Sequence, residues 1–113
     1  MAITYNSNNR TNHAWNDHPE RMRLIGEYFG FTGIVVEVIE ERDGRPARKG
    51  LTSSGVVVVR KMDEDKIITA YMATERQALS ICYRAGKKQV PPKLWKKIMK
   101  NLEKHPELIS MAS

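Results

Sequence analysis

The sequence predicts a single α+β domain in which an antiparallel β-meander follows one N-terminal helix and precedes two C-terminal helices. The chain has 113 residues, 41% hydrophobic and 28% charged, which is typical of a globular domain with one core. Its middle third holds β-branched runs, whereas apolar residues recur at helical spacing on either side. We expect an irregular Asn-rich arm over residues 1–16, the domain over 17–105 and a C-terminal tail over 106–113.

The first helix is expected to begin at Asp17, with Pro19 in its first turn and Glu20 three residues after the cap. Gly30 is the predicted stop, because glycine readily adopts the left-handed conformation that follows many helices. Between these signals the apolar residues at helical spacing are Met22, Leu24, Ile25, Tyr28 and Phe29.

Three strands are expected next. Residues 34–41 are rich in β-branched side chains, residues 55–60 contain four consecutive valines, and residues 66–72 include Ile-Ile-Thr-Ala-Tyr. The short acidic stretch 63–65 favours a hairpin between the last two strands. Residues 43–50 carry glycine, proline and charge, which favours a loop.

Two helices are expected after the strands. Thr74 and Gln77 form a capping-box pattern that opens a helix through Ala78, Leu79, Cys82 and Tyr83 and stops at Gly86. A last helix follows Pro91 and Pro92 and runs to about Lys104. One of its faces carries Leu94, Trp95, Ile98, Met99 and Leu102, and another carries Lys93, Lys97, Lys100 and Lys104.

The net charge of +6 favours a polyanionic partner, because cationic side chains release the condensed counterions of nucleic acids. RNA or DNA is therefore the expected partner, although such a charge also keeps a small protein soluble. The only cysteine, Cys82, is expected to be a buried structural thiol. No disulfide is possible within one chain and no apolar run approaches the roughly 20 residues of a membrane span, so we expect a cytoplasmic protein without membrane contact.

The motifs of metal and cofactor chemistry are missing from the sequence. It contains no His-Glu-x-x-His, no pair of cysteines and no Gly-rich phosphate loop that ends in Lys-Ser or Lys-Thr. We therefore expect neither a metal site nor a cofactor.

The remaining polar residues suit metal-free cleavage of phosphodiesters, which needs a base, an acid and cations that stabilise the phosphorane. His13 and His18 can titrate near neutral pH, and Arg21 can bind phosphate. Thr69 and Tyr71 share one face of their strand, and Ile68, Ala70 and Met72 are expected on the other, core face. Each residue also has a structural interpretation, since histidines in a polar arm are usually solvated and Thr and Tyr favour strands.

A second set of cations suits phosphate binding without catalysis. A lysine stripe is often only a solvated helix face, but its position close to other cations favours a phosphate-binding surface. The candidate residues are Arg23, Arg60, Arg84, Lys87, Lys88, Lys93, Lys97, Lys100 and Lys104.

A histidine followed by Arg-Met in a first helix, and then a strand that ends in Ile-Ile-Thr-Ala-Tyr, resembles the superfamily of barnase, EndoU, colicin-type and RelE-type ribonuclease toxins (the BECR fold). The matching residues are His13 or His18 with Arg21-Met22, and then Ile67 to Tyr71. The resemblance covers roughly residues 13–72. It implies that His13 or His18, with Thr69 and Tyr71, acts around the scissile phosphate and that Arg21 binds this phosphate.

Two main hypotheses follow. The first is a metal-independent endoribonuclease of toxin or phage type, for which an acidic immunity or antitoxin protein is a possible partner. The second is a non-catalytic nucleic-acid-binding or regulatory module that uses the lysine stripe. A third interpretation is a small phage or accessory protein that binds another protein, with the charge incidental.

Overall fold

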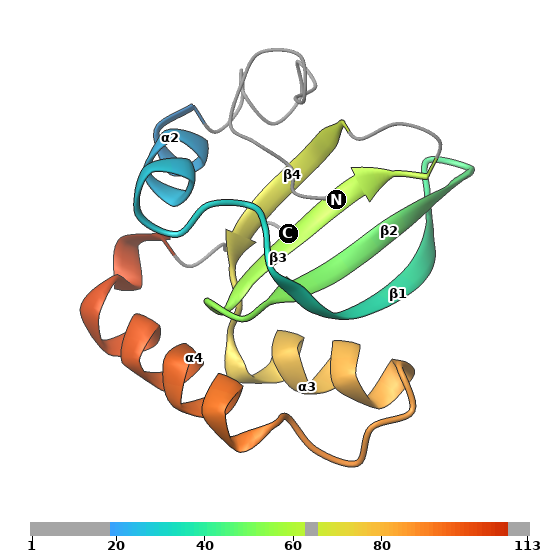
Figure 1. The fold of residues 1–113 in the computed structure, drawn as a ribbon. Helices are drawn as coiled ribbons and strands as arrows, with labels where there is room; N and C mark the ends of the chain where they lie inside the picture. The colour runs from blue at the N-terminus through green and yellow to red at the C-terminus, as the bar shows by residue number, and fades with distance from the viewer. Residues whose placement is uncertain (1–18, 63–65, 109–113) are drawn as a thin grey trace.

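The computed structural model describes residues 19–62 and 66–108, and its element order confirms the predicted α+β fold class (Figure 1). Four strands form one antiparallel sheet in the order β1-β2-β3-β4. They are β1 (Ile34–Arg42), β2 (Arg45–Thr52), β3 (Val56–Lys61) and β4 (Ile67–Met72). The helices are α2 (Pro19–Tyr28), α3 (Glu75–Arg84), α4 (Pro92–Lys104) and the 3-10 turn η2 (Pro106–Leu108).

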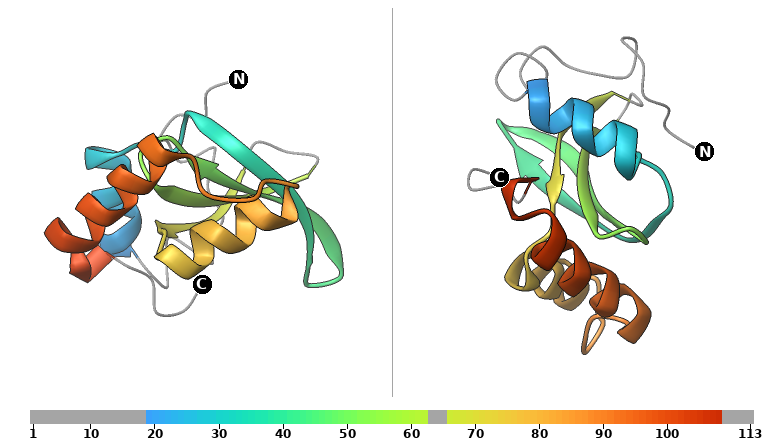
Figure 2. Two further views of the ribbon diagram at one scale, coloured as in Figure 1. Left: turned by 90° about the horizontal axis from the view of Figure 1, so that it is seen from below. Right: turned by 90° about the vertical axis from the view of Figure 1, so that its left-hand side faces the viewer.

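The sheet lies between two helical layers, with α2 on one side and α3 and α4 on the other (Figure 2). Each side has its own apolar cluster. The α2 core contains Met22, Ile25, Phe31, Val56, Val58, Ile67, Ala70, Met72 and Leu108. The α3/α4 core contains Val36, Val38, Ala47, Leu51, Val57, Val59, Tyr71, Ala73, Ala78, Ile81, Cys82, Val90, Leu94 and Ile98.

The valine strand β3 explains why the sheet has a core on each side. Val56 and Val58 face α2, whereas Val57 and Val59 face α3 and α4, and all four are fully buried. Successive side chains of a strand point to opposite faces, so an unbroken apolar run is expected where both faces are covered. The two helical layers satisfy this condition.

The predicted loop over residues 43–50 is wrong, because most of that segment belongs to β2. Asp43 and Gly44 form a two-residue turn with positive φ angles of 53° and 78°, as type I′ hairpin turns require. Pro46 lies near the start of β2, where the strand pairs only with β1, because pairing of β2 with β3 begins at Ala47. Proline is tolerated there because, among the described residues, the strand has a free edge at this position. The segment has few β-branched residues, and its strand conformation is stabilised by pairing with β1 on one side and β3 on the other.

The predicted helix boundaries agree well with the structure. Thr74 and Gln77 form a complete capping box at the start of α3, and α4 spans Pro92–Lys104. Gly30 follows α2 with a φ of 75°, and its N–H donates to the Ile25 carbonyl oxygen. The predicted cap Asp17 and the predicted arm over residues 1–16 lie outside the described residues.

The turn between β2 and β3 docks directly on α4. Asn101 Nδ2 donates a hydrogen bond to the Ser54 carbonyl oxygen (2.6 Å). The next residue, Gly55, has a φ of 87°, and a Cβ atom there would lie 2.9 Å from Asn101 Nδ2 and 3.2 Å from Ile98 Cγ1. Glycine at this position therefore allows close approach of the turn to the helix.

Gly55→Ala is expected to destabilise the protein more than Gly44→Ala. Both substitutions place alanine at a positive φ, which costs roughly 1–2 kcal/mol. Only Gly55 has neighbours in the way, since nothing lies within 4 Å of a Cβ at Gly44. Urea unfolding should show an additional loss of about 1–3 kcal/mol for Gly55→Ala, in the usual range of overpacking. Equal losses for the two variants would contradict the docking of this turn on α4.

Candidate nucleic-acid interface

Three of the five predicted catalytic residues lie together in the structure. Arg21 Nη2, on α2, donates to Thr69 Oγ1, on β4, over 3.2 Å. Burial lowers the pKa of Arg21, and its electrostatic interaction with Tyr71 opposes this shift. The other two, His13 and His18, lie outside the described residues.

The strand part of this cluster is buried. Thr69 is 3% exposed and Tyr71 is 0% exposed, so both side chains are shielded from solvent. Tyr71 belongs to the α3/α4 core, so the strand face that we expected to carry the site is buried at this residue. Ile68, which was assigned to the opposite face, packs on the same core as Tyr71, since a register shift interrupts the pairing of β3 with β4 between Val59 and Arg60.

The Tyr71 hydroxyl is a buried polar group with no hydrogen-bond partner among residues 19–62 and 66–108. A buried hydroxyl without a partner costs roughly 1–3 kcal/mol of stability. Its packing in the α3/α4 core is that of a large core side chain.

Three of the arginines predicted to bind phosphate, Arg23, Arg60 and Arg84, have carboxylates within ion-pair distance. Arg23 forms ion pairs with Glu20 (2.7 Å) and Glu27 (2.9 Å) on the exposed side of α2. Arg60, whose side chain is 11% exposed, lies 2.6 Å from Glu37. These carboxylates offset the positive charge that a phosphate would meet.

The remaining predicted arginine, Arg84, also has acceptors nearby. Its guanidinium lies 3.4 Å from a carboxylate oxygen of Glu40 and 3.5 Å from the Ile39 carbonyl oxygen, which ties the end of α3 to β1. The Arg84 side chain nevertheless remains 41% exposed.

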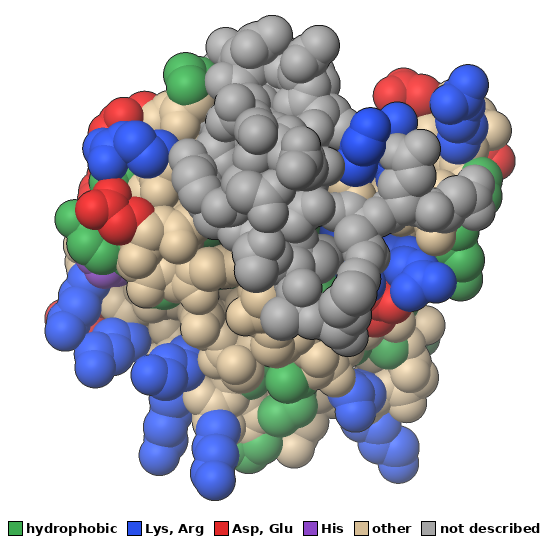
Figure 3. Space-filling view, turned by 45° about the horizontal axis from the view of Figure 1, so that its top comes forward, with side chains coloured by type: hydrophobic (Ala, Val, Ile, Leu, Met, Phe, Trp, Pro, Cys, Tyr) green, Lys and Arg blue, Asp and Glu red, His purple; other side chains and the backbone are tan. Residues whose placement is uncertain are grey.

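The lysines of α4 differ from these arginines. The four predicted lysines, Lys93, Lys97, Lys100 and Lys104, are all exposed. At about 100° per residue they fall within roughly 60° of the helix circumference. In the described part of the chain, no carboxylate lies within ion-pair distance of them. Figure 3 shows a group of Lys and Arg side chains at the lower left of the view.

Lys96 is a further exposed lysine of α4 that the sequence reasoning missed. It lies roughly 40° around the helix from Lys100, on the side of Trp95. The spacing of Lys96 from the other lysines of α4 is the only sequence signal for it, and a helical wheel of residues 92–104 would have shown it. We call the five residues Lys93, Lys96, Lys97, Lys100 and Lys104 the lysine face.

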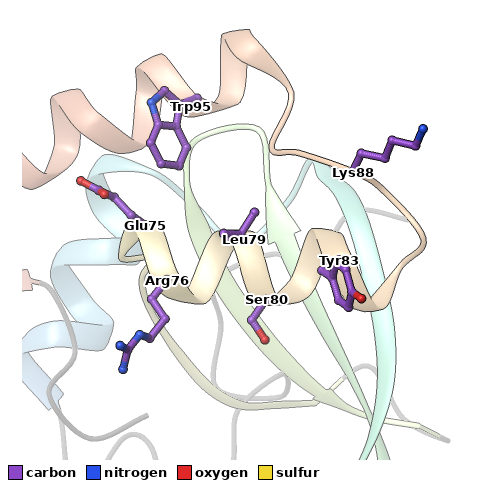
Figure 4. A pocket seen from close by; sticks show the side chains of 7 residues that line it. All are labelled: Glu75, Arg76, Leu79, Ser80, Tyr83, Lys88 and Trp95. Carbon is purple, nitrogen blue, oxygen red and sulfur yellow. The ribbon is translucent and has the colours of Figure 1, made fainter.

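An open groove of about 740 Å³ lies between α3 and α4 (Figure 4). It is lined by Glu75, Arg76, Leu79, Ser80, Tyr83, Lys88 and Trp95, and we call it the α3/α4 groove. Leu79 is 49% exposed and Tyr83 is 76% exposed, although both share the apolar spacing that predicted α3. The helix buries instead a narrower face of Ala78, Ile81 and Cys82. The predicted phosphate ligands Lys87 and Lys88 are exposed in the α3–α4 connection.

Cys82 is a free, buried cysteine, and burial raises the pKa of its thiol. The nearby Lys87 acts in the opposite direction but is the smaller cause. A neutral, buried thiol is a poor nucleophile, which favours the structural interpretation.

Within residues 19–62 and 66–108, no group of three or more His, Cys, Asp or Glu side chains could hold a metal ion. None of the helices in the same ranges has the length and apolar character needed to cross a membrane.

Comparison with known proteins found no matching family model, no matching curated protein and no matching solved structure.

Proposed function

We propose that this protein is a nucleic-acid-binding module that holds RNA or DNA by its phosphates through the lysine face of α4. The observation that carries this proposal is the contrast in pairing. Arg23, Arg60 and Arg84 have acidic acceptors, whereas the five lysines of α4 are exposed and have no carboxylate close enough for an ion pair among the described residues.

The spacing of the lysine face suits a phosphate backbone. Lys93 and Lys104 are eleven residues apart, which is about 16 Å along an α-helix. One nucleic-acid strand carries a phosphate roughly every 3.4 Å of duplex axis, so about five phosphates cover the same length. Five lysines over that length can each approach one phosphate.

The like charges of the lysine face lower the stability of α4, and this cost favours a role in binding. The lysine face contains three like-charge pairs four residues apart, Lys93 with Lys97, Lys96 with Lys100, and Lys100 with Lys104. Such pairs destabilise a helix by roughly 0.2–0.5 kcal/mol each. A bound polyanion removes this repulsion, because each phosphate lies between cations that otherwise repel one another.

The test is to measure the affinity for labelled RNA and DNA oligonucleotides over a range of salt concentrations. If four or five lysines contact phosphate, log affinity should fall with log salt with a slope of roughly −3 to −4.5. Binding that is independent of salt, or no binding at about 50 mM salt, would contradict the proposal.

A second candidate function is metal-independent RNA cleavage of the toxin or phage type, and the specific observation in its favour is the contact of Arg21 with Thr69 beside Tyr71. In this mechanism His13 or His18 takes the proton of the attacking 2′-hydroxyl or protonates the leaving oxygen. Arg21 would stabilise the charge that develops on the phosphate. An acidic immunity or antitoxin protein would then be a natural partner.

For this second function, we predict that the pure protein cleaves RNA in EDTA and leaves 2′,3′-cyclic phosphate ends. His13→Ala or His18→Ala should lower the cleavage rate by about 10²- to 10⁴-fold, as expected for loss of a general acid or base. The assay is a gel of total RNA with the wild type and both variants. Products with 5′-phosphates, or no cleavage by the wild type at high concentration, would exclude this mechanism.

A further inference from the structure

The α3/α4 groove presents an aromatic and aliphatic surface to solvent. Figure 4 shows the Trp95 ring extending from α4 toward α3, with Leu79 pointing from α3 toward α4. Tyr83 lies one helical turn beyond Leu79 and is 76% exposed. All three side chains line the same groove, so they are not isolated exposed residues, although Figure 4 shows the Tyr83 ring farther along α3 and directed away from Trp95.

Cations border this surface. Arg76 and Lys88 line the groove itself, whereas Glu75 is its only acidic lining residue within the described part of the chain. On α4, Trp95 lines the groove. The next residue, Lys96, lies about 100° around the helix and is the member of the lysine face nearest to the groove side. The apolar groove and the phosphate-binding lysines are thus adjacent surfaces of the same helix.

We propose that the α3/α4 groove receives unstacked bases of a single-stranded nucleic acid, with Tyr83 and Trp95 as stacking platforms. This inference rests on the proposed function and adds the class of nucleic acid to it. A strand whose phosphates follow Lys96 and Lys100 places its bases on one side of the backbone, and the groove lies on the Trp95 side of these lysines.

The arrangement favours a single strand over a duplex. In a duplex the faces of the bases are stacked and inaccessible, so aromatic side chains can only stack on bases that have left the helix. Proteins that bind single strands combine a cationic track with exposed aromatic residues in this way. A hydrophobic partner protein would use the apolar surface but would gain nothing from Arg76, Lys88 and the lysine face around it.

The experiment compares a single-stranded RNA with a hairpin duplex of equal length, using Tyr83→Ala and the wild type. Stacking of one base on tyrosine implies that Tyr83→Ala weakens single-strand binding by about 5- to 150-fold and leaves duplex binding within about twofold. Tyr28→Ala is the control for loss of an exposed tyrosine, since Tyr28 is 63% exposed and does not line the groove, and its only contact near α4 in the described residues is the stacking of its ring on His105. Its affinity for both RNAs should equal that of the wild type.

A second readout reports on Trp95 directly. The chain has two tryptophans, so a Trp15→Phe background leaves Trp95 as the only one. Its fluorescence should be quenched by the single strand and unchanged by the duplex.

Failure of this inference and failure of the proposed function give different results. Binding that depends on the lysines but is equal for both RNAs, and equal for Tyr83→Ala, would overturn the base-stacking groove alone. Absence of any RNA or DNA binding would overturn both. Tight binding of an acidic protein that Tyr83→Ala abolishes, without RNA binding, would assign the groove to a protein partner.

Discussion

The double variant Lys97→Glu/Lys100→Glu is expected to bind RNA or DNA at least about 25- to 60-fold more weakly than the wild type at roughly 0.1 M salt. Each lost phosphate contact removes the release of about 0.7–0.9 counterions, which is worth roughly five- to eightfold in affinity at that salt concentration. The slope of log affinity against log salt should become shallower by about 1.4–1.8. Fluorescence anisotropy with a labelled oligonucleotide over a salt series measures both quantities.

The matched control for this prediction is Arg45→Glu. Lys97 and Arg45 are both exposed, and each reversal changes the net charge by the same amount. Arg45 lies at the tip of the β1–β2 hairpin, far from α4 (Figures 1 and 2). Lys97→Glu should weaken binding by about five- to eightfold and Arg45→Glu by less than about twofold. Equal effects would mean that only the net charge matters and that the lysine face is a solvated surface.

Stability separates a binding role of the lysine face from a structural one. Lys97→Glu converts the like-charge pairs with Lys93 and Lys100 into opposite-charge pairs, which should raise the stability of α4 by a few tenths of a kcal/mol for each pair. A variant that binds more weakly but unfolds at the same or a higher urea concentration loses contacts to the ligand. A loss of both would instead indicate damage to the fold.

Local patterns predicted most of the fold. The capping box at Thr74 and the glycine stop at Gly30 depend on a few neighbouring residues, and these boundaries agree with the structure. The missed strand, β2, also had a local signal, because Asp43-Gly44 is a typical hairpin turn. That signal was outweighed by the charged, Pro-containing segment that follows, whose strand conformation depends on the two strands beside it.

The candidate sites were harder to predict because they depend on tertiary packing. Periodicity identifies an apolar helix face but cannot say how much of it the neighbouring elements cover, so Leu79 and Tyr83 resembled core residues of α3. The contact between Arg21 and Thr69 joins residues 48 positions apart, and only the packing of α2 on β4 brings them together. Charge counting likewise cannot show which arginines already have carboxylate partners.

One pair of variants separates a core role of Tyr71 from a catalytic one. Tyr71→Ala should destabilise the protein by about 3–5 kcal/mol, since it removes a fully buried aromatic ring from the α3/α4 core. Such a loss is a large fraction of the 5–15 kcal/mol that stabilises a typical domain. Urea unfolding of the variant measures it directly.

Tyr71→Phe keeps the ring and removes only the hydroxyl, which has no hydrogen-bond partner among the described residues. If Tyr71 is a core residue only, the free energy of unfolding should equal that of the wild type or exceed it by up to about 1–3 kcal/mol, because a buried polar group is no longer desolvated. If the hydroxyl instead stabilises a reacting phosphate, RNA cleavage in EDTA should fall by about 10²-fold or more while stability is maintained. Unchanged cleavage by a stable Tyr71→Phe variant would remove Tyr71 from the catalytic hypothesis, whereas a marked loss of stability would show that the hydroxyl has a partner in the folded protein.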